Sequence, residues 1–297
     1  MQCNKCRRDA VLFQKYSGQH LCEHHVEAYV EAKAKHEIRR NRWILPGDHI
    51  AVVLTGNPGS AALLYFLKKL TSLRRDIKIS AIALDEGITG YHDTGTASWI
   101  AESLETECFT GSFLETFGVT LDEIAHRKGA GSSCTYCRVF RNFLLNRIAK
   151  DQGVTKLASA ETLDDDAVYV LKHILGGTPE ILIHTERNFS IVPIIRPFIT
   201  LPLNEVELYT GLHNLKYEHS TCPYMNNAIE NDVRTLLNDF TLRHPATKYA
   251  LHNLGIHINE ECATMANTVS AYEQCGETAD GICQSCRILS EETVHGA

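Results

Sequence analysis

The sequence predicts an α/β protein in which a parallel sheet is wound between helices, with a small cysteine-rich module at each end. Three observations carry this prediction. Short apolar runs rich in β-branched residues alternate with helical stretches through the middle of the chain. The turn after the first of these runs is rich in glycine. Eleven cysteines fall mostly into pairs separated by two residues, a spacing that aims two thiolates at one metal ion.

Composition favours a globular protein of the cytoplasm. The 297 residues are 44% hydrophobic and 22% charged, which is ordinary for a folded domain. No apolar run approaches the roughly 18 residues of a membrane span, and the N-terminus does not resemble a secretory signal. An odd number of cysteines without such a signal favours metal ligation in a reducing compartment. The formal net charge of −7 argues against a surface covered with phosphate-binding groups.

Four segments are expected along the chain. Residues 1–25 form a Cys/His module that binds zinc, and residues 26–225 form the α/β domain together with a connecting basic helix. Residues 226–262 are a helical segment, and residues 263–297 form a second Cys-rich zinc module. The connecting helix, at about 25–43, carries five cations between positions 33 and 42: Lys33, Lys35, Arg39, Arg40 and Arg42.

The central elements follow one another as strand, helix and strand. Residues 49–54 (HIAVVL) are predicted to be a buried strand, because the run is short, apolar and β-branched. A glycine-containing turn leads to a helix at 61–73 and a second strand at 77–84, which is the opening of a parallel βαβ unit. The remaining predictions are strands near 105–109 and 156–160, an extended segment at 190–200, and helices at 121–127, 134–151, 163–175, 204–212 and 226–243.

The N-terminal cysteines predict a closed zinc site. Cys3, Cys6, Cys22 and His25 supply three thiolates and one imidazole, the tetrahedral ligand set of a structural zinc ion. His24 could replace His25, although the two-residue spacing favours His25. The alternative is that these are free buried cysteines.

The C-terminal cysteines give a weaker signal. Cys275, Cys283 and Cys286 provide three ligands, and Cys262 or His257 could complete the shell. An incomplete site is the alternative reading. We therefore expect one zinc ion, and a second one if the tail also folds around metal.

The turn at Thr55–Ser60 (TGNPGS) predicts an anion site. It follows the first strand and opens a helix, so its backbone N–H groups and the helix dipole favour a bound phosphate. Thr55, Gly56, Gly59 and Ser60 are the residues expected to contact it. Asp85, at the end of the second strand, lies where ligands of open α/β sheets gather.

In this context the chain resembles the ATP-pyrophosphatase (PP-loop) enzymes that thiolate tRNA at the 2-position of uridine or cytidine, and most closely those of the archaeal and eukaryotic cytosolic 2-thiouridine type. The resemblance covers nearly the whole chain and implies a Rossmann-like PP-loop fold. Its ordered matches include Cys3–Cys6 with Cys22–His25, Ile38–Arg40, Leu45–Asp48, the turn at 55–60, Leu84–Ile88, Gly90–Tyr91, Cys134–Cys137, Phe140–Arg141, Leu163–Ala167, Arg196–Phe198, Glu205–Val206, Cys222–Tyr224 and the terminal cysteines.

The chain departs from the family on the nucleotide side. The family turn reads Ser-Gly-Gly-Lys-Asp-Ser, whereas the Lys position here is Pro58 and the Asp position is Gly59. Proline brings neither a charge nor an N–H group, although it suits the first turn of a helix. The family's Gly-His-Asn is here Ala160–Thr162. ATP and Mg²⁺ binding is therefore expected to be weak, altered or absent.

The pair Cys134 and Cys137 opens a helix, and Cys222 lies 85 residues farther on. The resemblance implies that these three thiolates hold a four-iron four-sulfur (4Fe-4S) cluster, whose fourth iron stays open to a sulfide or persulfide. Residue types alone leave two alternatives, which are a reactive thiol pair and a third zinc site.

Two further residues complete the expected site. Arg141 lies one helical turn after Cys137, where it could balance cluster charge or hold a phosphate. Asp164 opens a helix, and the resemblance implies that the acid at this place acts in the catalytic pocket. Solvated basic and helix-capping roles are the respective alternatives.

The sequence thus predicts a divergent tRNA 2-thiolation protein, a tRNA sulfurtransferase that delivers sulfur from an open-site cluster. Its partners would be tRNA, held in part by the basic helix, and a sulfur donor, either sulfide or a sulfur-carrier protein. A homodimer is possible. The alternatives are a non-catalytic paralogue that binds tRNA or a partner and keeps the cluster for stability, and an iron–sulfur relay protein with another acceptor.

Overall fold

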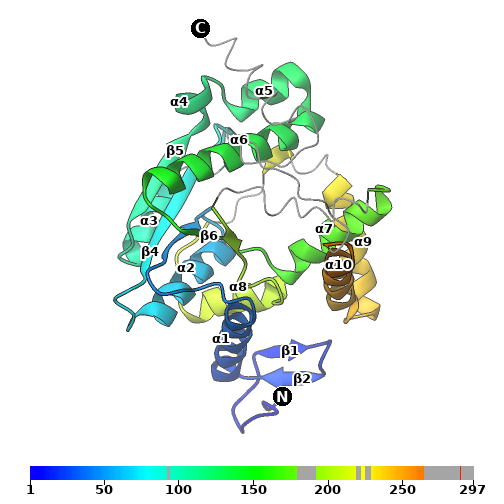
Figure 1. Cartoon of the computed structure of the whole chain (residues 1–297). Helices are drawn as coiled ribbons and strands as arrows, with labels where there is room; N and C mark the ends of the chain where they lie inside the picture. The colour runs from blue at the N-terminus through cyan, green and yellow to red at the C-terminus, as the bar shows by residue number, and fades with distance from the viewer. Residues whose placement is uncertain (92–93, 179–191, 219–221, 225–228, 264–287, 289–297) are drawn as a thin grey trace.

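The centre of the fold is a parallel sheet of five strands, seen in a computed structural model of the chain (Figure 1). The structure describes residues 1–91, 94–178, 192–218, 222–224, 229–263 and 288. The strands are β3 (His49–Val53), β4 (Lys78–Asp85), β5 (Cys108–Ser112), β6 (Lys156–Ala158) and β7 (Ile194–Ile195). They lie in the order β5-β4-β3-β6-β7, and all pairs are parallel. The predicted α/β class with a parallel sheet is confirmed.

Helices cover both faces of the sheet (Figure 1). The apolar core on one face includes residues of α1 (Glu23–Arg40), α2 (Pro58–Thr71), α3 (Thr94–Ser103) and α8 (Leu203–Leu212). The core on the other face includes α4 (Phe113–Phe117), α5 (Leu121–Lys128) and α6 (Ala130–Asp151). Along β3, Ile50 and Val52 join the first core and Ala51 joins the second. Burial on both faces explains why this strand is apolar throughout.

A third group of helices lies beside the sheet. It consists of α7 (Leu163–Leu175), α9 (Ile229–Arg243) and α10 (Thr247–Ala263), which pack around Val168, Val233 and Leu237. The buried pair of Asp166 Oδ2 and His252 Nδ1, 2.7 Å apart, joins α7 to α10. Within the described ranges, no helix is both long enough and apolar enough to cross a membrane.

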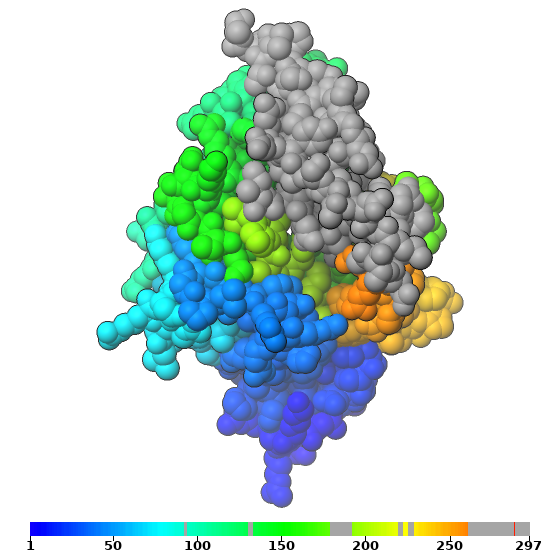
Figure 2. Space-filling model, in the orientation of Figure 1, coloured from blue at the N-terminus to red at the C-terminus, as the bar shows by residue number. Residues whose placement is uncertain are grey.

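The N-terminal module ends in an antiparallel hairpin, β1 (Leu12–Gln14) and β2 (Gln19–Leu21). It docks on the rest of the chain through Glu205, which is only 1% exposed. Gln14 Nε2 and Tyr16 O–H donate to Glu205 Oε1 over 2.8 and 2.6 Å. The Tyr16 ring also lies 5.0 Å from that of Tyr249 in α10. The module therefore forms one end of the molecule, next to the helices of the third group (Figure 2).

The sequence located most of these elements but misplaced some boundaries. The helix expected at 61–73 begins at Pro58, and the helix expected at 134–151 begins at Ala130. The strand expected near 105–109 runs from Cys108 to Ser112, because Glu105 takes a positive φ of 49° in the turn that precedes it. Only two residues of the extended segment form a strand in the described part. Of the predicted C-terminal module, residues 264–287 and 289–297 lie outside the described residues, and Ile288 is buried in the second core.

Substituting Gly87 by alanine is expected to destabilise the fold by about 2–5 kcal/mol. Gly87 has a φ of +68°, and an added Cβ would lie 2.7 Å from the Thr120 side chain and 3.2 Å from its Cα. Left-handed strain costs roughly 1–2 kcal/mol, and overpacking costs about 1–3 kcal/mol more. Urea unfolding measures the change. Gly90→Ala is the matched control, because its φ of +74° is similar but nothing lies within 4 Å. Equal losses in the two variants would refute the steric part of this argument.

Candidate functional site

The four predicted N-terminal ligands meet at one point. The ligand atoms of Cys3, Cys6, Cys22 and His25 all lie within 4.8 Å of one another. Cys6 Sγ lies 3.6 Å from Cys22 Sγ, and His25 Nδ1 lies 3.4 and 3.2 Å from the sulfurs of Cys3 and Cys22. Zinc–sulfur bonds of about 2.3 Å at tetrahedral angles place two sulfurs about 3.8 Å apart. The donor set therefore fits one zinc ion.

Local backbone contacts favour the thiolate form of Cys3, whereas at Cys6 a backbone hydrogen bond lowers the pKa but burial and the neighbouring thiols outweigh it and raise the pKa. Burial raises the pKa of Cys3, but hydrogen bonds from backbone N–H groups of Cys22, Lys5 and Cys6 outweigh it and lower the pKa to about 6. His24 does not belong to this ligand group, and its ring lies edge-on to that of His25. The choice of His25 over His24 thus agrees with the geometry.

The glycine-containing turn occupies the crevice expected of an open α/β sheet. Strand order reverses between β3 and β6, and the turn at Thr55–Ser60 follows β3 at that point. Such a switch point is where these sheets bind ligands. A Cβ built on Gly59 would meet Ala160, after β6, at an ordinary 3.6 Å. The predicted position of the turn therefore agrees with the fold, and Pro58 does open the helix, at its first turn.

The turn satisfies its own polar groups. Asn57 caps α2, since its Oδ1 accepts from Ser60 N over 2.8 Å. Ser60 Oγ donates to Asn57 O over 3.0 Å, and Thr55 N donates to Ser60 Oγ over 3.3 Å. Gly56 O accepts from the backbone N–H of Glu218 over 2.8 Å. Two of the N–H groups that could bind a phosphate, those of Thr55 and Ser60, thus already donate to side chains of the turn itself.

Cys134, Cys137 and Cys222 lie within electrostatic reach of one another. Burial raises the pKa of Cys134, and a charge on Cys222 raises it further. Burial also raises the pKa of Cys137 to about 12, with contributions from Glu86, Cys222 and Cys134 and an opposing one from Arg141. Cys137 and Cys222 pack against the same core. The raised pKa values of Cys134 and Cys137 keep these two thiols protonated at neutral pH, so a metal centre that binds them must release protons.

The spacing of the three thiols differs from that of the N-terminal group. Among the described residues, the sulfur atoms of Cys134, Cys137 and Cys222 do not form a group in which all lie within 4.8 Å of one another. A single zinc ion needs that closeness, whereas a multinuclear cluster holds its thiolates farther apart. Three mutually interacting thiols at this wider spacing fit an iron–sulfur cluster better than a third zinc ion.

Arg141 connects the thiols to the strand ends. Its Nε lies 3.5 Å from Glu86 Oε1, and its positive charge opposes the high pKa of Cys137. Glu86 is 6% exposed, and burial raises its pKa although Arg141 lowers it. Tyr91 faces the same groups: burial raises its pKa to about 12, assisted by Cys222 and Glu86. A buried acid, a guanidinium and a phenol therefore surround the sulfur atoms.

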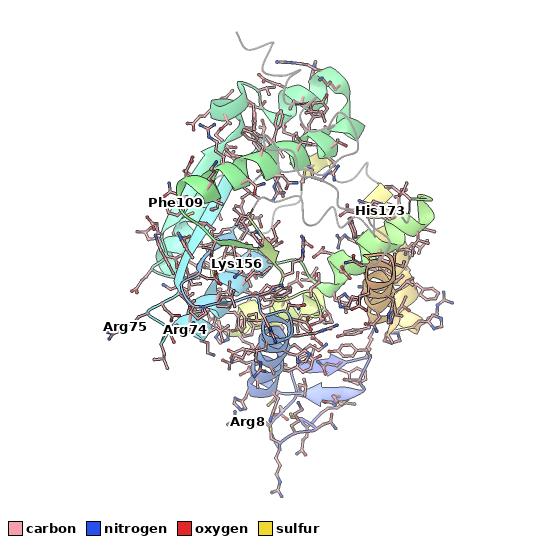
Figure 3. All side chains as sticks on the ribbon, viewed as in Figure 1. Arg8, Arg74, Arg75, Phe109, Lys156 and His173 are labelled. Carbon is pink, nitrogen blue, oxygen red and sulfur yellow. The ribbon has the colours of Figure 1, made fainter. Side chains whose placement is uncertain are left out.

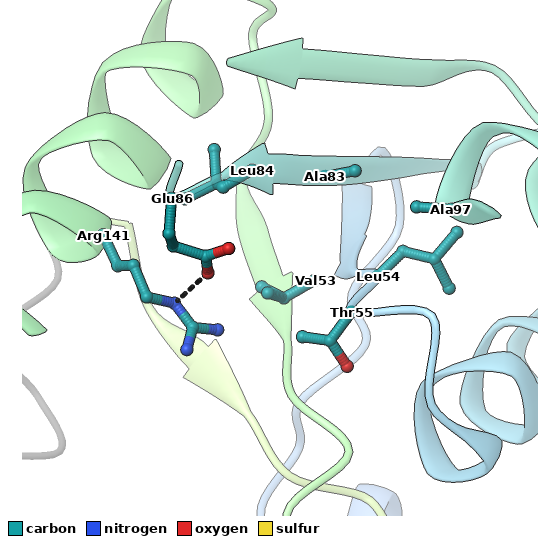
Figure 4. Close-up of a pocket in the computed structure, with 8 residues that line it drawn as sticks. All are labelled: Val53, Leu54, Thr55, Ala83, Leu84, Glu86, Ala97 and Arg141. Atoms are coloured by element: carbon teal, nitrogen blue, oxygen red, sulfur yellow. Dashed lines mark ion pairs between the residues drawn. The ribbon is translucent and has the colours of Figure 1, made fainter. Parts of the chain in front are cut away.

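Figure 4 shows the small pocket that joins this group to the turn. Glu86 and Arg141 form one wall, and Thr55 forms part of the other. The floor comes from the ends of β3 and β4 and from α3, through Val53, Leu54, Ala83, Leu84 and Ala97. Of the predicted site residues, Arg141 from the sulfur group and Thr55 from the turn thus border a common space.

The two predicted acids occupy different places. Asp85 Oδ1 accepts from Gly87 N over 2.8 Å, so it shapes the turn after β4 beside the pocket. Asp164 lies instead in a groove with Tyr16 and Glu205. Its Oδ1 is 2.5 Å from Lys248 Nζ, and its Oδ2 accepts from Leu203 N over 2.7 Å. Both oxygens of Asp164 join helices, and its catalytic role stays a prediction.

The predicted metal ligands of the C-terminal module cannot be placed, because they fall outside the part of the chain that the structure describes. Cys275, Cys283 and Cys286 lie outside the described residues, as does the side chain of Cys262. Cys108 is half-buried against the first core.

The basic helix offers fewer free cations than its sequence suggests. Lys33 Nζ lies 4.6 Å from the centre of the Tyr249 ring and donates to Tyr249 O–H over 3.1 Å. Lys35 forms a 2.8 Å ion pair with Glu31. Arg39, Arg40 and Arg42 remain exposed at the end of α1. Figure 3 shows Arg8 at the tip of the N-terminal module and Arg74 and Arg75 at another edge, so the basic side chains labelled there do not form one patch.

Sequence reasoning missed Asp122, which touches the segment around Cys222. Tyr224 O–H donates to its Oδ1 over 2.6 Å. In the sequence Asp122 resembles any acid in the first turn of a helix. No local signal could have linked it to a residue about one hundred positions away.

Comparisons with known proteins agree with this site. The family description "PP-loop domain" matches residues 26–239, and "2-thiouridine synthetase TtuA, N-terminal LIM domain" matches residues 2–25. The chain is 29% identical to the tRNA 2-thiolation protein NcsA of Haloferax volcanii, over 97% of this chain and 98% of that protein. It is 27% identical to the tRNA-5-methyluridine(54) 2-sulfurtransferase of Pyrococcus horikoshii, over 84% and 80%. Among solved structures it resembles the U34-tRNA thiolase NcsA of Methanococcus maripaludis with its 4Fe-4S cluster, with a TM-score of 0.84, 25% identity, and 98% and 96% coverage.

Proposed function

Because the chain belongs to the PP-loop family and carries an N-terminal domain of the 2-thiouridine synthetase kind, we propose that it is a tRNA 2-sulfurtransferase. The observation that supports this proposal is that Cys134, Cys137 and Cys222 interact electrostatically with one another, while Arg141, which interacts with Cys137, lines the strand-end pocket. The similar proteins named above are 2-thiolation proteins, and one was solved with its 4Fe-4S cluster. Related proteins of several Drosophila species are named cytoplasmic, which supports that location here.

The three cysteines would hold the cluster. When bound by three thiolates, such a cluster leaves one iron open to an incoming sulfur species. Arg141 would offset the negative charge of the thiolates, since it already interacts with Cys137. Glu86 fixes the guanidinium from the other side. The chain itself therefore supplies charge balance around the sulfur.

Glu86 and Tyr91 could hold protons beside the reacting base. Burial raises the pKa of the Glu86 carboxyl group, which makes it a stronger proton acceptor than an exposed carboxylate. Thiolation of a uridine replaces the C2 oxygen by sulfur. In the proposed reaction ATP would adenylate that oxygen, which would then leave with AMP as the sulfur bonds to C2, and N3 ends the reaction with its proton restored. Glu86 lies at the strand ends, between the turn at 55–60 and the thiols. We propose that the carboxylate form of Glu86 accepts that proton and that the resulting carboxylic acid returns it.

Anaerobic reconstitution with iron and sulfide, followed by incubation with unthiolated tRNA, sulfide and magnesium ATP, tests the proposal. The native protein is expected to show the visible absorbance of an iron–sulfur cluster and to form 2-thionucleosides, measured by mass spectrometry of digested tRNA. Cys137→Ala is expected to lose both signals at least a hundredfold, because two thiolates cannot retain the cluster. Cys108→Ala, which removes a cysteine of the other core, is the matched control and should retain both. An active Cys137→Ala protein would refute the proposed site.

A non-catalytic paralogue is the second candidate, and the turn at 55–60 favours it. Pro58 lacks an N–H group, and Asn57 already engages the N–H of Ser60. A protein of this kind would bind tRNA or a partner protein and keep the cluster without turnover. Cluster formation without thionucleoside, with sulfide and ATP supplied, would favour this role over the first.

A further inference from the structure

One carboxylate joins three segments around the sulfur site. Asp122 lies in the first turn of α5. Its Oδ1 accepts from Tyr224 O–H over 2.6 Å. Its Oδ2 accepts from Thr89 N and Thr89 Oγ1 over 2.8 and 2.7 Å. Asp122 thus holds the turn after β4 and the segment after Cys222 at the same time.

These bonds are of the strong, charge-assisted kind. Burial raises the pKa of Asp122, but the bonds from Tyr224 and Thr89 outweigh it, and the net pKa lies below its usual value. At neutral pH the acceptor is therefore ionised. A hydrogen bond to a charged group stabilises about twice as strongly as a neutral one.

The start of α5 contacts the chain near Cys222 on one side and near Glu86 on the other. Tyr224 is two positions after Cys222, and both side chains pack against the core below α5 and α6. On the other side, Leu121 N donates to Glu86 O over 2.9 Å and Asp122 N donates to Gly87 O over 3.4 Å. The start of α5 therefore sets the position of Glu86, which faces Arg141, as well as that of Cys222.

We propose that Asp122 is a positioning residue of the sulfur site, which holds Cys222 beside Cys134 and Cys137 through Tyr224. The two cysteines of α6 share one rigid helix, whereas Cys222 comes from a distant segment and needs its own anchor. The inference rests on the proposed sulfur site but concerns its preorganisation. It therefore has consequences in the protein without iron.

The first test is thiol cross-linking in the reduced, iron-free protein. A short, thiol-specific bifunctional reagent is added without oxygen, and peptides joining Cys222 to Cys134 or Cys137 are quantified by mass spectrometry. Tyr224→Phe keeps the ring and removes only the O–H donor, and Asp122→Ala removes the acceptor. Both are expected to lower the cross-linking rate about tenfold, the loss of one hydrogen bond to a charged group. Glu115→Ala, which removes an exposed acid in the first turn of α4, is the control and should react as the native protein does.

The second test is retention of iron. After reconstitution, both variants are expected to release iron to a chelator about tenfold faster than the native protein, while N-terminal zinc content is unchanged. Native-like cross-linking and iron release in Tyr224→Phe would overturn the inference, and so would a native protein that does not cross-link. If cross-linking depends on Asp122 but the native protein takes up no iron, the positioning role stands and the cluster in the proposed function fails.

Discussion

Loss of the N-terminal metal is expected to release residues 1–25 from the rest of the chain. Cys22→Ser and His25→Ala each remove one ligand of the four that meet there. So small a module has little core of its own, and its hairpin is only three residues on each strand. Without metal we expect the module to unfold, and with it the contacts that Gln14 and Tyr16 make.

The effect should spread to the body of the protein. Glu205 would lose both of its donors, and the part of its carboxyl group that α8 and α10 still cover would lack a partner. A buried polar group without a partner costs about 1–3 kcal/mol, which lowers the thermal midpoint of a chain of this size by about 2–10 °C. Metal analysis, thermal unfolding and limited proteolysis after Lys15 measure the result. His24→Ala is the matched control, since His24 is adjacent but outside the ligand group. Loss of zinc in His24→Ala, with zinc kept in His25→Ala, would reverse the ligand assignment.

Restoring the family turn is expected to create or strengthen ATP binding. The triple change Asn57→Gly, Pro58→Lys and Gly59→Asp removes the side chain that engages Ser60 N and supplies the missing cation and acid. Position 59 has room, because an added Cβ there would meet only ordinary contacts, 3.6 Å or more away. Lysine adds a point charge for the phosphates. We expect at least tenfold tighter binding of magnesium ATP, or about 1.4 kcal/mol.

Calorimetric titration compares the native protein with the variant. Ser72→Asp with Leu73→Lys is the control, since it adds the same two charges at the exposed far end of α2. Native binding as tight as that of the triple variant would show that the turn holds ATP as it stands. The outcome also separates the two candidate functions, because absence of ATP binding by the native protein would favour the non-catalytic function.

Local signals explain which parts of the fold could be predicted. Helix α7 has the predicted bounds, because an acidic first turn begins it and two glycines follow its end. Strand β3 could be predicted from the sequence because both of its faces are apolar. Helix α3 could not be predicted, because its sequence (TGTASWIAES) buries only Ala97, Ile100 and Ala101 and shows no clear helical periodicity of apolar residues. The hairpin β1–β2 is too short to leave a pattern.

In the candidate site, too, only residues that are close in sequence could be grouped from local patterns. The N-terminal ligands are close in sequence, so their spacing alone indicated their meeting. Cys222 is brought to its place by tertiary contacts such as that of Tyr224 with Asp122, and only the resemblance to a family linked it to Cys134. The partners of Asp164 could not be foreseen either, because Lys248 lies 84 positions away.

The bond between Glu218 N and Gly56 O has a consequence for communication between substrates. It fastens the turn at 55–60 to the chain four positions before Cys222. Thr96 Oγ1 donates to the Glu218 carboxylate over 2.9 Å and holds the same point. A nucleotide that changes the conformation of the turn must either keep this hydrogen bond or displace Glu218, which lies four positions before Cys222. Nucleotide occupancy and sulfur loading would then be thermodynamically linked, each altering the affinity for the other.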